Sequence, residues 1–226
     1  MSQFIIRQFD KYFVEKDDHF LHQLSTFYCN IWRFDPNFAE YMQCTNGDCG
    51  KYFSYNDYHQ KNITCCTICS SPLTDAWKED DVAQTIINLI NMEEDFFGVV
   101  AVLPDFTNTI LGFCWGYNKK LETITDKKVQ QAVFNDSGYT PYFNEIASDT
   151  SYRNQGIGSS LCRTLTEWMQ RTSPNIPGYL HTHENSPARR LFEKAGYNFL
   201  CYDEKMGDGR IFMYVDKCKN LTPENL

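Results

Sequence analysis

Apolar residues recur along the chain with the two spacings that are typical of helices and of strands. In three segments, 20–31, 82–90 and 157–169, they stand three or four positions apart, so each segment can bury one face of an amphipathic helix. The apolar runs at 97–103 and 109–117 instead indicate strands, and the turn residues between them predict a β-hairpin.

The second half of the chain alternates predicted strands with predicted helices. Ser186 is a good N-cap, Pro187 suits the first helical position, and Gly196 is placed to end that helix. The remaining predicted strands are 4–6, 142–147, 179–183, 198–202 and 210–215. Together these elements predict a mixed α/β fold, with a mainly antiparallel sheet flanked by helices.

The composition is that of a globular, acidic protein. With 226 residues, 42% of them hydrophobic, the chain can bury one core, and we expect a single domain over 1–226. The net charge of −8 disfavours nucleic acid and favours a cationic partner or substrate. No apolar run reaches the ~20 residues that cross a bilayer, and 1–13 does not resemble a signal peptide, so we expect no membrane association.

The ten cysteines fall into two groups. Five lie within 44–69, and the others are scattered, mostly through apolar segments: Cys29, Cys114, Cys162, Cys201 and Cys218. A secreted disulfide scaffold would be shorter and would place its cysteines in loops. The scattered cysteines are therefore expected to be reduced core residues, and the protein is expected to be cytoplasmic.

Two cysteine pairs have the spacing of a four-cysteine zinc site. Cys44 and Cys49 form the first pair, and Cys66 and Cys69 form the second. Tetrahedral Zn²⁺ takes one such pair from each of two tight turns. Cys65 leaves the assignment open, because it can replace Cys66 with a longer spacer.

The surrounding segment, 44–72, is predicted to be an inserted zinc-ribbon-like module. It has few aliphatic residues, so it can hardly fold without the metal. Four cysteines close the coordination sphere, so the expected role of the zinc is structural. Lys51 and Lys61 are balanced by Asp48 and Asp57, which argues against a ribbon that binds nucleic acid. Its aromatic residues are expected to pack rather than to form a partner surface: Tyr52, Phe53, Tyr55 and Tyr58.

A glycine-containing turn, 153–158, lies between the predicted strand 142–147 and the helix that begins near Ile157. The first N–H groups of a helix have no intrahelical partner, and the helix dipole adds partial positive charge there. Since Gly156 and Gly158 have no side chain that would block a ligand, the turn suits a pyrophosphate. The alternative is an ordinary strand-to-helix turn. The turn has neither the Gly-Lys-Ser/Thr ending of a Walker loop nor a full dinucleotide fingerprint.

Two stretches carry a family resemblance. NEIASDTSYRNQGIGSSLCRTL, at 144–165, resembles the acetyl-CoA-binding motif of the GNAT superfamily of N-acetyltransferases, Arg/Gln-x-x-Gly-x-Gly/Ala. Further on, NSPARRLFEKAGY, at 185–197, resembles the second motif of that superfamily. The match covers 142–200, and the rest of the chain fits by its order of elements, apart from the insertion.

The resemblance implies contacts with acetyl-CoA along three segments. It implies backbone pairing with the pantetheine arm, backbone binding of the pyrophosphate with one arginine nearby, an asparagine at the cofactor or at a bound water, and a phenylalanine along the pantetheine. On this resemblance, Ile146 and Ala147 pair with the pantetheine arm. The pyrophosphate is bound by the backbone of Gln155, Gly156, Ile157, Gly158 and Ser159, with Arg153 nearby. Asn185 is the asparagine at the cofactor or at a bound water, and Phe192 is the phenylalanine along the pantetheine.

Glu145 is the candidate general base, since an amine must lose a proton to attack a thioester and the resemblance places the thioester beside this residue. Alternatively, Glu145 is a solvated strand residue or only attracts a cationic substrate. The general acid is open, because Phe192 stands where many members of the family have tyrosine. Tyr197 and Tyr179 are the substitutes by proximity.

The resemblance therefore implies an acetyl-CoA-dependent N-acetyltransferase, in which an amine attacks the thioester directly. The alternative is a catalytically inactive protein that binds acyl-CoA or docks a partner. Polyamines, aminoglycosides, protein N-termini and lysine all stay open as acceptors, and so does the oligomeric state. His181 and His183 share one face of a strand, where we expect surface or hydrogen-bonded core roles.

Overall fold

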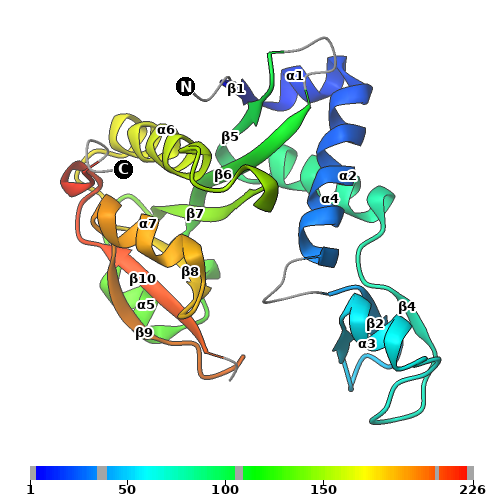
Figure 1. Cartoon of the computed structure of the whole chain (residues 1–226). Coiled ribbons are helices and arrows are strands. Elements are labelled where there is room, and N and C mark those ends of the chain that lie inside the picture. The colour runs from blue at the N-terminus through cyan, green and yellow to red at the C-terminus, as the bar shows by residue number, and fades with distance from the viewer. Residues whose placement is uncertain (1–3, 35–39, 105–108, 207–208, 223–226) are drawn as a thin grey trace. The chain divides into compact units, whose positions relative to one another are not determined.

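The computed structural model describes residues 4–34, 40–104, 109–206 and 209–222 (Figure 1). The chain divides into two compact units. One unit comprises Met1–Phe13 and Leu89–Leu226, and the other comprises Val14–Asn88. The cysteine-rich segment lies within the second unit, so the compact unit around it is larger than the inserted module expected at 44–72.

The larger unit is built on a seven-stranded sheet in the order β1-β5-β6-β7-β8-β10-β9. Neighbouring strands are antiparallel except for β7 and β8, which confirms the predicted fold class and the predicted hairpin. The strands are β1 (Ile5–Phe9), β5 (Glu94–Val102), β6 (Ile110–Lys120), β7 (Tyr139–Ser148), β8 (Gly178–His183), β9 (Asn198–Tyr202) and β10 (Arg210–Val215).

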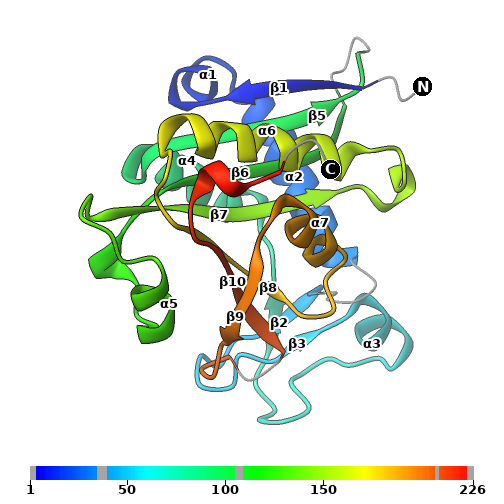
Figure 2. The ribbon, with the colours of Figure 1, turned by 90° about the vertical axis from the view of Figure 1, so that its left-hand side faces the viewer.

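Two helices complete the core of this unit. Figure 2 shows α6 (Ile157–Thr172) along one face of the sheet, with α7 (Pro187–Ala195) beside β8. Leu161 and Leu165, on the apolar stripe of α6, are fully buried. The ends of α7 lie where they were predicted: the hydroxyl of Ser186 accepts from the N–H of Ala188, and Gly196 ends the helix at φ +102°.

Shorter elements cover the rest of this unit. The helix α5 (Lys127–Ala132) carries Val129, which is buried in a second, smaller apolar cluster with Tyr179 and Cys201. Three 3₁₀ turns are also described: η1 (Leu121–Thr123), η2 (Thr150–Tyr152) and η3 (Cys218–Asn220).

The smaller unit holds a three-stranded sheet and most of the N-terminal helices. Its sheet has the order β3-β2-β4. In the described part of the chain, these elements are α1 (Lys11–Lys16) and α4 (Glu79–Met92), which cross the unit boundaries, and α2 (Asp18–Phe34), β2 (Met42–Cys44), β3 (Tyr52–Phe53), α3 (Tyr55–Gln60) and β4 (Leu73–Asp75). No helix in the described residues is both long and apolar enough to span a bilayer.

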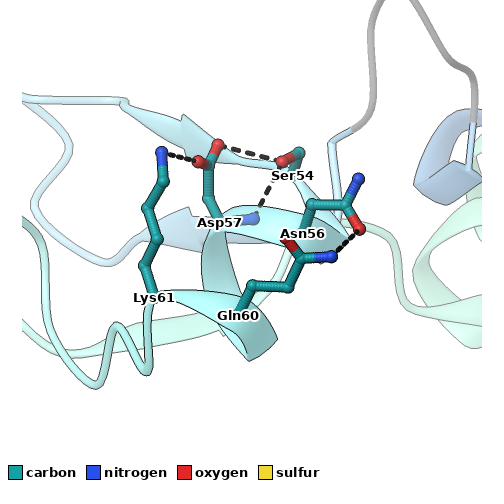
Figure 3. A network of polar contacts seen from close by, with 5 residues as sticks. All are labelled: Ser54, Asn56, Asp57, Gln60 and Lys61. Atoms are coloured by element: carbon teal, nitrogen blue, oxygen red, sulfur yellow. Dashed lines mark hydrogen bonds and ion pairs between the residues drawn. The ribbon is translucent and has the colours of Figure 1, made fainter.

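The short helix α3 is held by polar contacts on its surface (Figure 3). Ser54 is the N-cap: its hydroxyl accepts from the N–H of Asp57 at 3.1 Å and donates to the Asp57 carboxylate at 2.9 Å. Lys61 forms an ion pair with the same carboxylate at 2.6 Å, and Gln60 donates to Asn56 at 3.3 Å. Because a six-residue helix is unstable by itself, the cap and the ion pair fix where this one begins and ends.

Candidate functional site

The strands β7 and β8 part from one another in the middle of the large sheet. They are parallel and pair only over Tyr142–Phe143 and Tyr179–Leu180. Beyond that point β7 continues to Ser148 along β6, while β8 continues to His183 along β10. In Figure 2, β8 and β10 turn away from β7. The backbone of β7 after Phe143 is thus available to pair with an extended ligand instead of a strand.

A β-bulge in β7 lies where the two strands part. Glu145 is opposite Trp115 and Phe143 is opposite Gly116, so Asn144 is an extra residue. The Asn144 side chain accepts from the indole N–H of Trp115 at 2.7 Å. Since directly opposed residues share a face, the bulge places the half-buried Glu145 on the same face as Trp115.

The glycine turn opens onto α6 in the predicted way. Asn154 and Gly156 have φ of +62° and +82°, in the left-handed region that favours glycine. Gly156 is the N-cap of α6 and provides no side-chain hydrogen bond. The first amides of α6 therefore lack a side-chain cap, and with the helix dipole they form a site that suits an anion.

The residues around this turn are placed to contact a ligand through their backbone more than through their side chains. Ile157 is buried at 2% exposure, and a Cβ on Gly158 would lie 3.1 Å from the side chain of Leu191. Arg153 and Gln155 are exposed, and Ser159 is half-buried. A ligand above the turn can therefore meet main-chain N–H groups and the Arg153 guanidinium.

The other predicted cofactor residues lie along β7 and near α7. Ile146 packs against the core cluster under α6, whereas Ala147 is opposite Phe113. Phe192 is buried and meets the ring of Phe143 edge-on, with ring centroids 4.9 Å apart. Asn185 is exposed just after β8.

Tyr197, one of the two tyrosines considered as the catalytic acid, lies in the core of the larger unit. Its side chain is 2% exposed within the core cluster. Its hydroxyl donates to the sulfur of Met169 on α6 at 3.4 Å. Burial raises the pKa of Tyr197 well above its ordinary value. In this structure the hydroxyl is enclosed by core side chains, so it is not placed to contact a leaving thiolate.

Three tyrosines line the face that carries Glu145. The ring of Tyr142 lies 5.5 Å from that of Tyr117 and 4.7 Å from that of Tyr179. Burial raises the pKa of Tyr117, and the charges of Tyr142, Glu93 and Glu145 raise it further. This face is therefore aromatic and acidic, which suits a cationic group.

His181 and Asp203 form a second polar group on the same face, and their positions in the sequence do not indicate that they meet. His181 is the first residue of β8 beyond its pairing with β7, and it alternates with Tyr179. Its Nε2 lies 3.2 Å from the carboxylate of Asp203, and its ring stacks on Phe212 with centroids 4.5 Å apart. The side chains of His181 and Asp203 are only 21% and 12% exposed. No local pattern links these two residues, because they meet only through the sheet.

The second candidate site is the cysteine cluster of the smaller unit. The sulfurs of Cys44, Cys49, Cys66 and Cys69 all lie within 4.8 Å of one another. Those of Cys44 and Cys69 are 3.4 Å apart, and those of Cys49 and Cys66 are 3.6 Å apart. A tetrahedral zinc with Zn–S bonds of about 2.3 Å needs sulfurs about 3.8 Å apart. Cys65 is exposed and outside the cluster, so the geometry favours Cys66.

Backbone amides support each sulfur of the cluster. In each case the donor is the N–H two residues further along the chain. Asn46 donates to Cys44, Lys51 to Cys49, Ile68 to Cys66 and Ser71 to Cys69. Hydrogen bonds with the side chain and the backbone of Ser71 lower the pKa of Cys69 to about 6. Such bonds favour thiolates, which are the form that binds a metal, whereas burial raises the pKa of Cys44 to about 12.

Comparisons with known proteins agree with this fold. The family model described as acetyltransferase (GNAT) family matches residues 62–197. The chain is similar in structure to a histone acetyltransferase HPA2 and related acetyltransferase from Corynebacterium glutamicum, at 14% identity and a TM-score of 0.53, over 96% of this chain and 97% of that chain. It is also similar to NAA60 of Arabidopsis thaliana in complex with acetyl-CoA, at 13% identity and a TM-score of 0.50, over 94% and 97%. A search of curated protein sequences finds no match.

Proposed function

Because the chain belongs to the GNAT family of acetyltransferases, we propose that it transfers the acetyl group of acetyl-CoA to an amine. The observation that carries the proposal is the parting of β7 and β8 beside the uncapped start of α6. The backbone edge of β7 and the anion site at the start of α6 lie at the two ends of the connection from β7 to α6. Pantetheine and pyrophosphate need these two features in this order.

The residues of this chain supply binding and orientation for acetyl-CoA. The amides of 155–159 hold the pyrophosphate, with Arg153 beside them, and Ile146 and Ala147 pair with the pantetheine arm. Phe192 packs along it, supported by its contact with Phe143. When bound, acetyl-CoA supplies the thioester that the amine attacks.

The amine attacks the thioester directly in this proposal, without a covalent acyl-enzyme. Burial raises the pKa of Cys162 to about 12 and that of Cys114 well above its ordinary value. A thiolate is the nucleophilic form of cysteine, so neither residue is suited to accept an acetyl group.

We call the face of the sheet that carries Glu145 and Tyr142 the acceptor face. Two groups on this face can take the proton of the amine. Glu145 follows the bulge of β7, and His181, held by Asp203, follows the last pairing of β8. Because both side chains share the face of Tyr142, an amine that enters from this face meets a carboxylate and an imidazole. The carboxylates of Glu145 and Glu93 and the nearby tyrosines favour a cationic acceptor.

The experiment that tests this function is a turnover assay with acetyl-CoA and a panel of amines, followed by mass spectrometry of the product. The panel contains a polyamine, an aminoglycoside, a peptide with a free N-terminus and a lysine peptide. An acetylated amine with release of CoA is the expected result. Tight binding of acetyl-CoA without turnover of any amine would instead support an inactive, acyl-CoA-binding protein.

We also propose that Cys44, Cys49, Cys66 and Cys69 hold one structural zinc ion. Their mutual distances and the amide bonds to each sulfur support this assignment. Four thiolates leave no position for a catalytic water, so the metal stabilises the small sheet. None of the ten cysteines, all of which lie in the described part of the chain, is joined in a disulfide, an arrangement that fits a reducing compartment such as the cytoplasm.

A further inference from the structure

A contiguous aromatic surface lies on the smaller unit, and neither the acetyl-CoA site nor the zinc cluster uses it. It consists of Phe34, Tyr41, Tyr55, Tyr58 and His59. Tyr55 lies at the centre: its ring is 4.3 Å from that of His59, 5.1 Å from that of Tyr41 and 5.7 Å from that of Phe34. Tyr58 closes the group, at 5.0 Å from His59 and 5.6 Å from Tyr41. We call this group the aromatic surface.

The aromatic surface is held in place by the helix that carries it. Tyr55, Tyr58 and His59 stand at the first, fourth and fifth positions of α3, so they share one face. The cap at Ser54 and the ion pair of Asp57 with Lys61 fix the ends of this helix (Figure 3). The rings are therefore ordered before any ligand arrives, which lowers the entropic cost of binding.

Packing inside the unit does not account for Phe34 and Tyr55, whereas Tyr41 and Tyr58 are half-buried. The core of the small sheet is a separate cluster in which Phe53 is 4% exposed and the cysteines are also buried or half-buried. By contrast, Phe34 is 54% exposed and Tyr55 is 43% exposed. The sequence-based expectation of packing thus fits Phe53 but not Tyr55. Contiguous exposed aromatic rings commonly mark a binding surface.

The charge of the unit points to a cationic ligand. Residues 14–88 contain 11 acidic and 5 basic side chains. Two of those bases are already paired, Lys61 with Asp57 and Arg33 with Asp75. Four thiolates around a divalent metal would add further negative charge. Aromatic rings attract cations over their faces, so the rings and the acidic composition of residues 14–88 favour the same kind of partner.

We propose that the aromatic surface is a docking site for a lysine- or arginine-rich peptide segment, whose cationic side chains lie over the faces of Tyr55 and Phe34. This binding activity is separate from acetyl transfer and does not depend on it. An extended basic segment matches the observations because it offers several cations along one chain. An oligonucleotide would bring negative charge to an acidic unit.

The test uses the full, zinc-loaded chain and fluorescence anisotropy with a short labelled peptide of alternating lysine and serine. The matched probe has glutamate in place of lysine. Tyr55→Phe keeps an aromatic face, and Tyr55→Leu keeps apolar volume without it. Phe134→Leu is the control, since Phe134 is 70% exposed on the larger unit.

The basic peptide is expected to bind, more weakly as salt rises, and the acidic peptide is not. Tyr55→Leu should weaken binding about 3- to 30-fold, the range of a cation–π contact, whereas Tyr55→Phe and Phe134→Leu should not change it. If Tyr55→Leu loses zinc, Phe34→Leu serves as the test variant, because Phe34 ends α2 outside the small sheet. Equal affinity of Tyr55→Leu and Tyr55→Phe would overturn the proposal. So would preferential binding of a single-stranded oligonucleotide, or self-association that Tyr55→Leu abolishes.

Discussion

At the scale of single residues, the candidate catalytic side chains differ in burial. Tyr197 was a reasonable acid by its place in the sequence, yet its hydroxyl lies under α6 against Met169. Glu145 keeps partial exposure on the face where β7 and β8 part. His181 joins it there from the neighbouring strand.

If Glu145 accepts the proton, Glu145→Gln should lower kcat by roughly 10²–10⁴-fold with the affinity for CoA unchanged. Raising the pH should partly restore turnover, because more of the amine is then neutral. Steady-state kinetics with Glu167→Gln, an exposed carboxylate on α6, is the control. A higher KM with normal kcat would show that Glu145 only attracts the substrate.

If His181 and Asp203 act as one unit, their substitutions should not be additive. His181→Ala should lower kcat, and Asp203→Asn should lower it less, since the imidazole loses only its orienting partner. The double variant should be no slower than His181→Ala alone, as a double-mutant cycle would measure. Normal turnover in both single variants would leave this pair with a structural role only.

Tyr197→Phe should leave turnover within about two-fold of the unchanged protein, because a buried hydroxyl does not reach the reacting atoms. It should lower the free energy of unfolding by at most about 1 kcal/mol, the scale of one hydrogen bond. Urea unfolding and steady-state kinetics measure the two effects. A loss of turnover of about 10²-fold in a folded Tyr197→Phe protein would restore this tyrosine as the acid.

At the scale of elements, the site depends on how a strand and a helix begin and end. The extra residue Asn144 in β7 turns Glu145 towards the acceptor face. The left-handed backbone at Gly156 lets α6 start without a side chain over its first amides. Each feature is local, and we propose that they serve one ligand because they lie at the two ends of the strand-to-helix connection.

Gly156→Val should lower the affinity for acetyl-CoA by about ten-fold or more, measured by calorimetry. There is open space around a Cβ at this position, so the cause is the φ of +82°, which a β-branched residue adopts only with strain. Gly138→Val is a matched control, with φ +79° and equally open space before β7. It should cost stability but keep the affinity. Unchanged affinity in Gly156→Val would contradict the proposed pyrophosphate site.

At the scale of the whole molecule, the chain combines two compact units. The unit formed by 1–13 and 89–226 carries the sheet, α6 and α7. The unit formed by 14–88 has a small sheet whose buried cluster includes Cys44 and Cys66 as well as Phe53. So few apolar side chains support the second sheet that a metal is the expected source of its stability.

One zinc ion per chain is expected by elemental analysis. A chelator should raise hydrogen exchange in 42–75 before it does so in the large sheet, because only the first depends on the metal. Cys65→Ser should keep the zinc, and Cys66→Ser should lose it. A metal-free protein whose 42–75 segment is equally protected would contradict the zinc site.

Several features of this protein could be predicted from the sequence because their cause is local. The limits of β9 and β10 agree with the apolar runs at 198–202 and 210–215, since a strand is set by alternation over a few residues. The ends of α7 follow from the cap chemistry of Ser186 and Gly196. The glycine turn before α6 also depends on neighbouring residues only.

Tertiary structure alone decided the features that depend on contacts between distant segments. The pairing of β7 with β8 over two positions, the approach of Asp203 to His181 and the clustering of Cys66 with Cys44 and Cys49 all join residues far apart in sequence. So does the enclosure of Tyr197 by Met169. Backbone periodicity and capping act within a few residues, whereas the surroundings of a side chain depend on which distant elements pack against it.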